Sequence, residues 1–546
     1  MIFVPPLVRH AALAAVVLGL QACGGGGTSS EPATVVVSGA TTFDSVPNKT
    51  AGTGQWGSLV YAATTTKPMR GVTAQAISVA DNTTVLASTT TSDQGTYALT
   101  LPSNTAFFMR VRAELVKTSG TSTWNVAVKD NTQGDALYVL DGTPLSSGAA
   151  NLVVNIKAAS GWNGANYSGL RAGGIAAILD TIYSGIKVVT AAQPASVFAP
   201  LTVMWSPLNT NVSGTLALGE IGTSFFTTSA AGVRAIYLLG KEGIDTDEYD
   251  GAVVAHEYGH YLQSAFSTNH SLGGSHGYPD KLDMTVAFSE GWGNAWAGIA
   301  RNDPMYADSY GFSQASGFAF SVAIPAKVSA APASVPVGWF REDSIDSSLY
   351  LLSAQQGFAP IWAALTGPMK TTQSALASIF SFADAVRNAG NASVTTAMNS
   401  LLAAQGIFTN AGANQWGDNE SNNGGEPANL PIYTPLVLGA AKTVCFSAAN
   451  VTDGTANKLG STRYFRINLT AAGTRTVTAR FSSGRDVDFE VFQNRTLLVN
   501  ADTPATASLN EVATVPLQAG EVIIRVLDYV TTPLATGAAC ATLTIS

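Results

Sequence analysis

The chain contains the stretch Asp250-Gly251-Ala252-Val253-Val254-Ala255-His256-Glu257-Tyr258-Gly259-His260-Tyr261-Leu262. Its apolar residues recur at the spacing of a buried helix, and Asp250 is a suitable N-cap for that helix. Residues four apart lie on one face of a helix, one turn from each other. The His256 and His260 imidazoles can therefore bind the same ion.

The residue types of this motif indicate a zinc site. Zinc prefers neutral imidazole nitrogen and carboxylate oxygen, and a catalytic zinc site keeps one position for water. Glu257 follows the first histidine, and we expect it to act as the base that takes a proton from this water. Without a metal, two histidines and a glutamate would be costly in a buried core helix, which is the alternative interpretation.

A second helical pattern, Phe288-Ser289-Glu290-Gly291-Trp292-Gly293-Asn294-Ala295-Trp296, carries an isolated acid. It predicts Glu290 as the third ligand. The competing ligands are His270, His276 and Asp283. The two histidines lie in a glycine-rich loop that would lose conformational entropy on binding an ion, whereas a helix is a rigid platform.

HEYGH followed by Glu-Gly-Trp-Gly-Asn resembles the gluzincin metallopeptidases of the fungalysin and thermolysin type. The resemblance covers roughly residues 172–405 and implies one zinc ion held by His256, His260 and Glu290, with Glu257 as catalytic base. It also implies that Asn294 is a hydrogen-bond partner of a ligand histidine. The family usually has Asp there, and an amide raises the basicity of an imidazole less, so metal affinity or activity is expected to be lower.

The residue that would stabilise the oxyanion differs from the one used in this family. Thermolysin-type enzymes use a histidine well after the third ligand, but this chain has no histidine after His276. We expect His276 or Tyr278, in the loop between the two ligand helices, to serve instead. Tyr350 is a further candidate, and the alternative for each is a merely solvated or packed side chain.

Two β-rich segments flank this region. Residues 34–157 alternate apolar and polar side chains, as in Val72 to Val79, and predict a β-sandwich. Lys67 to Val72 and Asp93 to Leu99 in this segment resemble carboxypeptidase regulatory-like domains. Residues 158–409 predict the α+β metallopeptidase domain, with helical patterns dominant from Ala252 to about Gln405.

The C-terminal segment, residues 436–546, returns to alternation, as in Tyr464 to Leu469 and Val522 to Leu527. It predicts a second sandwich and resembles prepeptidase C-terminal domains. Residues 410–435 are rich in Asn, Gly and Glu and predict a linker. The expected fold class is therefore multidomain, with a central α+β zincin-like domain between two all-β sandwiches.

The N-terminus has the pattern of an export signal. Its apolar run, Ala11 to Leu20, is shorter than the roughly 20 residues that span a bilayer. Leu20-Gln21-Ala22-Cys23 resembles a bacterial lipoprotein signal, with ordinary cleavage as the alternative. We expect residues 1–22 to be removed, Cys23 to be lipidated and residues 23–33 to form a flexible tether. This predicts a bacterial cell-envelope lipoprotein, at the outer membrane or cell surface, or a secreted protein.

Two further features bear on compartment and ions. Cys445 and Cys540 bracket the last segment and are expected to form a disulfide in an oxidising compartment. The run Asp245-Thr246-Asp247-Glu248-Tyr249-Asp250 is rich in acids. It could hold a structural calcium ion, with helix capping and solvation as the alternative.

Composition limits the partners. The net charge is −8 and the pI is near 5.2, so no row of basic residues is available to neutralise phosphates, and nucleic acid is not expected. We expect a monomer that meets the membrane through its lipid anchor and hydrolyses protein or peptide substrates as a metalloendopeptidase. The alternatives are a degenerate peptidase that serves as a surface adhesion protein, and a zinc hydrolase of non-peptide amides or esters.

Overall fold

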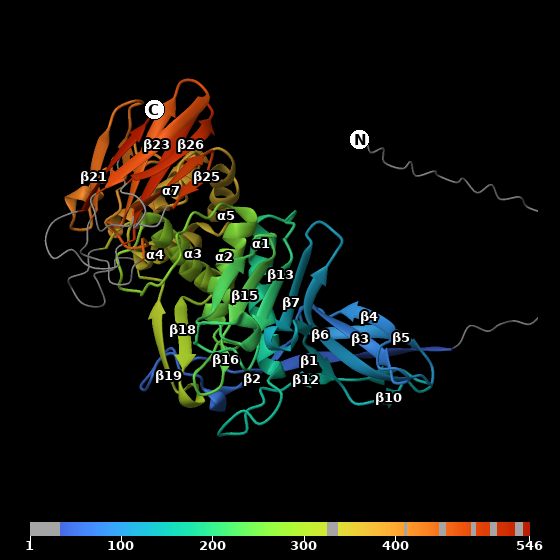
Figure 1. The fold of residues 1–546 in the computed structure, drawn as a ribbon. Coiled ribbons are helices and arrows are strands. Elements are labelled where there is room, and N and C mark those ends of the chain that lie inside the picture. Colours follow the sequence, from blue (N-terminus) through green and yellow to red (C-terminus); the bar gives the residue numbers. More distant parts are fainter. Residues whose placement is uncertain are drawn as a thin grey trace, which may run out of the picture.

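The computed structural model describes residues 33–324, 337–408, 412–446, 455–481, 487–502, 510–529 and 539–546. The expected signal peptide, the lipidation site Cys23 and all but the last residue of the expected tether lie outside these ranges. The N-terminal strands, drawn in blue, lie at one end of the molecule, helices occupy the middle, and the C-terminal sandwich packs at the other end (Figure 1).

The N-terminal strands belong to two sheets. Along β5 (Thr96–Pro102) every second residue is buried, as a period of two requires. In the smaller sheet, β1 (Thr34–Ser45) pairs with β5 and with β2 (Thr65–Pro68), β11 (Leu152–Val153) and β12 (Ile156–Ala158). The N-terminal strands of the larger sheet are β3 (Val72–Ser78), β4 (Val85–Thr90), β6 (Ala106–Lys117), β7 (Trp124–Asp130), β8 (Ala136–Leu137), β9 (Val139–Asp141) and β10 (Leu145–Ser146).

The larger sheet continues into the next part of the chain, in the order β14-β15-β13-β7-β6-β3-β4. β13 (Leu201–Trp205) pairs in parallel with β7 and with β15 (Arg234–Leu238), and β14 (Phe225–Thr228) ends this order. The boundary expected at residues 157 and 158 therefore does not separate two sheets, because strands from both sides share one sheet and one core. Alternation predicts strands but not which distant strands pair, which explains the difference.

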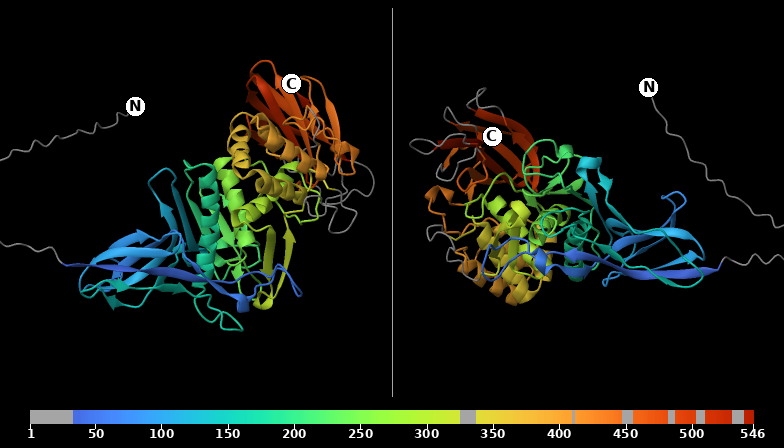
Figure 2. Two further views of the ribbon diagram at one scale, coloured as in Figure 1. Left: turned by 180° about the vertical axis from the view of Figure 1, so that it is seen from behind. Right: turned by 90° about the horizontal axis from the view of Figure 1, so that it is seen from below.

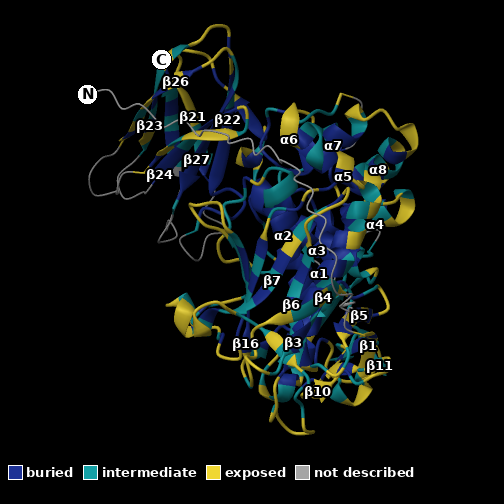
Figure 3. Ribbon diagram, turned by 90° about the vertical axis from the view of Figure 1, so that its right-hand side faces the viewer, coloured by how far each residue is buried: buried dark blue, intermediate teal, exposed yellow. Residues whose placement is uncertain are grey.

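The helices are packed between this sheet and the C-terminal sandwich (Figures 1 and 2). They are α1 (Ala172–Ala192), α2 (Gly251–Phe266), α3 (Met284–Arg301), α4 (Glu342–Gln356), α5 (Ala359–Thr366), α6 (Pro368–Thr371), α7 (Ile379–Asn388) and α8 (Ala392–Ala404). Figure 3 shows mostly buried residues along α2 and α3, whereas α1 combines buried and intermediate residues. Among the described residues, α1 alone is long and apolar enough to cross a membrane, yet Ile178, Ile182 and Ile186 on it belong to the central core.

A β-hairpin interrupts the region that the sequence predicts to be mainly helical. β18 (Met305–Tyr310) and β19 (Ser316–Ser321) pair antiparallel and join β16 (Gly240–Lys241) and β17 (Asp245–Thr246) in a small sheet. Aromatic residues at every second position, such as Phe318 and Phe320, favour this strand pairing over a helix. The expectation of helical structure from residue 252 to about 405 is therefore wrong for this segment.

The C-terminal segment forms two sheets around its own core. One has the order β20-β22-β27-β24-β25 and the other β21-β28-β23-β26. A disulfide joins Cys445 on β21 to Cys540 on β28, the pair that the sequence suggested. The strands are β20 (Tyr433–Pro435), β21 (Lys442–Phe446), β22 (Thr462–Leu469), β23 (Gly473–Phe481), β24 (Val487–Gln493), β25 (Thr496–Ala501), β26 (Asn510–Leu517), β27 (Gly520–Asp528) and β28 (Ala539–Ile545).

The stretch expected to be a linker, residues 410–435, is packed where the structure describes it. Trp416 and Ile432 are buried in the central core, and β20 adds to the C-terminal sandwich through β22. The Glu420 carboxylate accepts hydrogen bonds from the backbone N–H groups of Phe408 and Asn422. A few large apolar side chains and satisfied backbone groups therefore compensate for the polar composition.

Candidate metal centre

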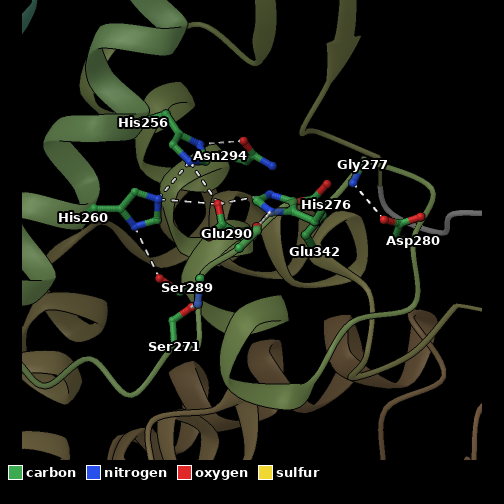
Figure 4. A network of polar contacts seen from close by, with 12 residues as sticks. His256, His260, Ser271, His276, Gly277, Asp280, Ser289, Glu290, Asn294 and Glu342 are labelled. Atoms are coloured by element: carbon green, nitrogen blue, oxygen red, sulfur yellow. Dashed lines mark hydrogen bonds and ion pairs between the residues drawn. The ribbon is translucent and has the colours of Figure 1, made fainter. Parts of the chain in front are cut away.

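Two adjacent helices carry the three predicted ligands. His256 and His260 lie on α2, and Glu290 lies on α3. His256 Nε2 is 3.0 Å from His260 Nε2 and 3.3 Å from Glu290 Oε2, and His260 Nε2 is 3.5 Å from the same oxygen. Figure 4 shows both imidazoles turned toward Glu290. These residues form a group that could bind a metal ion such as zinc.

Hydrogen bonds to the other ring nitrogens fix the orientation of the imidazoles. His256 Nδ1 lies 2.8 Å from Asn294 Oδ1, so its N–H donates to the amide oxygen and Nε2 keeps its lone pair. His260 Nδ1 lies 3.3 Å from Ser289 Oγ, which in turn donates to Gln263 Oε1 at 3.1 Å. The sequence predicted Asn294 but missed Ser289 and Gln263, although both are neighbours of predicted ligands.

Glycines allow α2 and α3 to approach closely enough for this geometry. A Cβ atom at Gly293 would lie 2.6 Å from the His256 ring. A Cβ atom at Gly259 would lie 3.1 Å from Trp296 and 3.3 Å from the Cα atom of Gly293. The second glycine of the Glu-Gly-Trp-Gly-Asn motif therefore leaves the space that His256 occupies.

Glu257 lies between the two histidines on α2 and faces the same cleft. Burial raises the pKa of its carboxyl to about 7, with Glu290 adding to this rise and His256 opposing it. The Phe226 backbone N–H donates a hydrogen bond to it. A carboxyl with a pKa near neutrality can both accept and return a proton.

The cleft over these residues has a volume of about 860 Å³. One wall includes Phe225 and Phe226 of β14, the strand at the end of the large sheet. Another is formed by Tyr306, Phe318 and Phe320 of the hairpin, whose rings are within 9° of parallel. The cleft thus combines the last strand of the large sheet, an aromatic wall and the candidate metal ligands.

The structure brings His276 to the metal centre. Its Nε2 lies 3.5 Å from Glu290 Oε2 and 3.9 Å from Oε2 of Glu342, a buried residue at the start of α4 that the sequence analysis missed. Tyr278 also lines the cleft, with its ring centroid 4.1 Å from that of Phe320. Tyr350 is not among the residues that line the cleft.

The other two competing ligands have structural partners elsewhere. His270 Nδ1 accepts a hydrogen bond from the Ala377 N–H at 2.9 Å, and its Nε2–H donates to the Arg495 carbonyl at 3.1 Å. Burial lowers the pKa of His270 to about 4, so the imidazole is neutral at pH 7. Asp283 caps α3 through the Thr285 N–H.

A second acidic group lies beside the N-terminus of α2. Carboxylate oxygens of Asp245, Asp247, Asp250 and Asp308 all lie within 4.8 Å of one another. Burial raises the pKa of Asp245 and Asp308 to about 7, and each has one buried oxygen without a hydrogen-bond partner. The sequence run supplied three of these residues. Glu248, also in that run, is ion-paired with Arg171 instead.

Comparison with protein-family profiles finds no match for the chain, and comparison with curated proteins finds none either. Among solved structures, the precursor of protealysin, a metalloproteinase from Serratia proteamaculans, is 9% identical. The match covers 53% of this chain and 90% of that one, with a TM-score of 0.31.

Two smaller solved structures also match. The pre-peptidase C-terminal domain of a Bacillus anthracis collagenase is 9% identical and covers 21% of this chain and 94% of its own, with a TM-score of 0.17. A periplasmic inhibitor of g-type lysozyme from Aeromonas hydrophila is 13% identical and covers 21% and 96%, with a TM-score of 0.15. At these TM-scores none of the three likenesses identifies the function of this chain.

Proposed function

We propose that the protein is a zinc metallopeptidase of the gluzincin type that hydrolyses internal peptide bonds. The observation that carries the proposal is the convergence of His256, His260 and Glu290 in a cleft that also contains Glu257. Two imidazole nitrogens and one carboxylate oxygen are a donor set that zinc uses in catalytic sites, where the fourth position stays open. The hydrogen bonds at both Nδ1 atoms support this assignment, because they leave both Nε2 atoms for the metal.

The chain's own residues have defined roles in hydrolysis. When bound, zinc supplies Lewis-acid chemistry that polarises the scissile carbonyl and acidifies water. Glu257 takes the proton of the attacking water and then delivers it to the leaving amine. His276 stabilises the negative charge that develops on the carbonyl oxygen, and Tyr278 is a second candidate for this role.

Two observations support peptide hydrolysis over the alternatives. A degenerate peptidase would be expected to lose the contact that orients His256. Here the Asn294 amide oxygen still accepts a hydrogen bond from the His256 N–H. β14 lies at the end of the sheet order and borders the cleft, and an extended peptide can add to such an edge. This edge favours a peptide over a small ester or amide.

Hydrolysis of a peptide library, with simple esters and amides in parallel, tests the proposal. Glu257→Gln preserves the shape of the side chain but removes the base, so zinc should remain bound while turnover of the cleaved peptides falls on the order of a thousandfold or more. Near wild-type turnover by this variant would mean that another base operates. Cleavage of esters but of no peptide would replace the proposed substrate class.

Location and further ions belong to the same proposal. Export is supported by the disulfide of the C-terminal sandwich, which is typical of proteins outside the cytoplasm. We propose that the exported chain either carries a lipid at Cys23 or is secreted. We propose a monomer with protein or peptide substrates and no nucleic-acid partner. The cluster of Asp245, Asp247, Asp250 and Asp308 is proposed to hold a structural calcium ion, because oxygen-only sites suit that ion.

A further inference from the structure

The loop that carries His276, residues 267–283, joins α2 to α3. Gly273 and Gly274 have φ values of +59° and +88°, a conformation that glycine adopts without strain. A glycine-rich loop has many accessible conformations, so holding it in one of them costs conformational entropy. Contacts from outside the loop are therefore needed to keep His276 beside Glu290.

Asn457 of the C-terminal segment makes such contacts. Its Nδ2 donates to the carbonyls of Gly273 and Ser275, both at 2.9 Å. The amide is 1% exposed, and its oxygen accepts a hydrogen bond from Thr455 Oγ1, which fixes the direction of the donating nitrogen. One buried side chain thus holds the backbone on two sides of Gly274, directly before His276.

Lys458 holds the same segment with a charge. Its Nζ donates to the Ser275 carbonyl at 2.6 Å and lies 3.5 Å from Asp280 Oδ2, on the other side of His276. The lysine is 4% exposed, so the ammonium is not free to rearrange into solvent. It also donates to the side-chain oxygen of Asn457 at 3.0 Å, which links the two side chains into one unit.

Backbone pairing continues this contact to the start of α3. The Asp283 N–H donates to the Asn457 carbonyl at 2.7 Å, and the Leu459 N–H donates to the Lys281 carbonyl at 2.9 Å. The Tyr464 hydroxyl contacts both Asp283 carboxylate oxygens, at 2.8 and 2.7 Å. The helix that carries Glu290 and the loop that carries His276 therefore rest on the same segment.

We propose that Asn457 and Lys458 are positioning residues that hold His276 at the metal centre. The C-terminal sandwich is then a required part of the catalytic unit and not a separable accessory module. The inference deepens the proposed function and rests on it, because it assigns to His276 a role in the transition state. It adds that this role depends on a segment outside the zinc-binding helices.

The test uses the full chain with the substitutions Asn457→Ala and Lys458→Met. The controls are the same substitutions at exposed residues of the sandwich, Asn500→Ala and Lys442→Met. Both test variants should keep stoichiometric zinc and wild-type KM, while kcat falls on the order of tenfold to a hundredfold, as displacement of a transition-state group requires. Deuterium uptake of residues 271–280 should rise in the test variants and stay at the wild-type level in the controls.

Wild-type kcat in both test variants would overturn the inference, even if the loop became more mobile. Loss of zinc together with kcat would also overturn it, because the segment would then support the ligands and not His276. If the wild-type chain cleaved no peptide, the proposed function would fail. The deuterium uptake of residues 271–280 would then test the positioning role of Asn457 and Lys458. Higher uptake in the test variants would support that role, and unchanged uptake would reject it.

Discussion

Gly293 sets how near α3 can come to His256. Helix interiors usually favour alanine over glycine by about 1 kcal/mol, so a glycine here must have another reason. The reason is contact, because a Cβ atom at this position would lie 2.6 Å from the His256 ring, inside normal van der Waals distance. The metal geometry is thus set partly by a residue that offers no donor.

Gly293→Ala should therefore lower zinc affinity at least tenfold while leaving the helix content unchanged. The imidazole must move away from Glu290 to make room, and misplaced ligands bind zinc less tightly. Zinc titration with a competing chelator measures this. Gly251→Ala, at the start of α2 where the new Cβ atom comes no closer than 3.4 Å to its neighbours, should keep wild-type affinity. Equal affinities for both variants would refute the role of Gly293.

The predicted ligand positions follow from the sequence because helical spacing alone places His256 beside His260. Ser289 and Gln263 were out of reach, since their contact with His260 depends on how α2 packs against α3. From the sequence, His276 was only one of several candidates for the residue that stabilises the oxyanion. Its loop has no periodicity, and its position depends on contacts from residues far along the chain.

At the level of secondary structure, the β18–β19 hairpin has two roles that the sequence did not predict. The hairpin adds the side chains of Tyr306, Phe318 and Phe320 to the cleft. Its first strand, β18, also places Asp308 beside Asp245, Asp247 and Asp250. Four carboxylates this close repel one another when they are ionised. A bound dication would remove that repulsion and fix the hairpin to the N-terminus of α2.

Calcium should accordingly raise the melting temperature of the zinc-loaded protein. At 100 times its dissociation constant, a ligand that binds only the folded state contributes about 2.7 kcal/mol. The double variant Asp247→Asn, Asp308→Asn should lose the response, and magnesium should reproduce it poorly because it gives up its water shell reluctantly. A melting temperature that is unaffected by millimolar calcium would exclude the calcium site.

At the level of the whole molecule, the β-rich N-terminal part, the helices and the C-terminal sandwich are joined by shared structure. β7 and β13 connect the first two through the sheet, and the loop of residues 267–283 rests on the third. The sequence predicted the order of β-rich and helical segments well. It could not predict how these parts are joined, because strand pairing and buried polar contacts between distant segments produce no recognisable pattern in the local sequence.

His270 makes the docking of the sandwich sensitive to acid. Burial lowers its folded-state pKa from an ordinary value of 6.5 to about 4. The hydrogen bond to the Arg495 carbonyl opposes this shift, and the positive charges of Arg525 and Arg495 add to it. Since the folded state needs the neutral imidazole, its stabilising effect is complete above pH 6.5 and is lost as the pH falls toward 4. The shift corresponds to at most about 3 kcal/mol.

Thermal unfolding between pH 7 and pH 5 should therefore show a steeper loss of stability for the wild-type chain than for His270→Gln. The glutamine amide can still donate to the Arg495 carbonyl but does not titrate. Parallel pH profiles for the two proteins would show that His270 does not stay neutral in the folded state.

Zinc content of the purified Glu290→Ala variant tests the central claim most directly, with His276→Ala and His270→Ala measured beside it by elemental analysis. We predict one zinc per chain in the wild type, in His276→Ala and in His270→Ala. Glu290→Ala should contain essentially none, because among the described residues Glu290 completes the ligand set with His256 and His260. Stoichiometric zinc in Glu290→Ala together with its loss in His276→Ala would contradict the account and replace it with a site of three histidines.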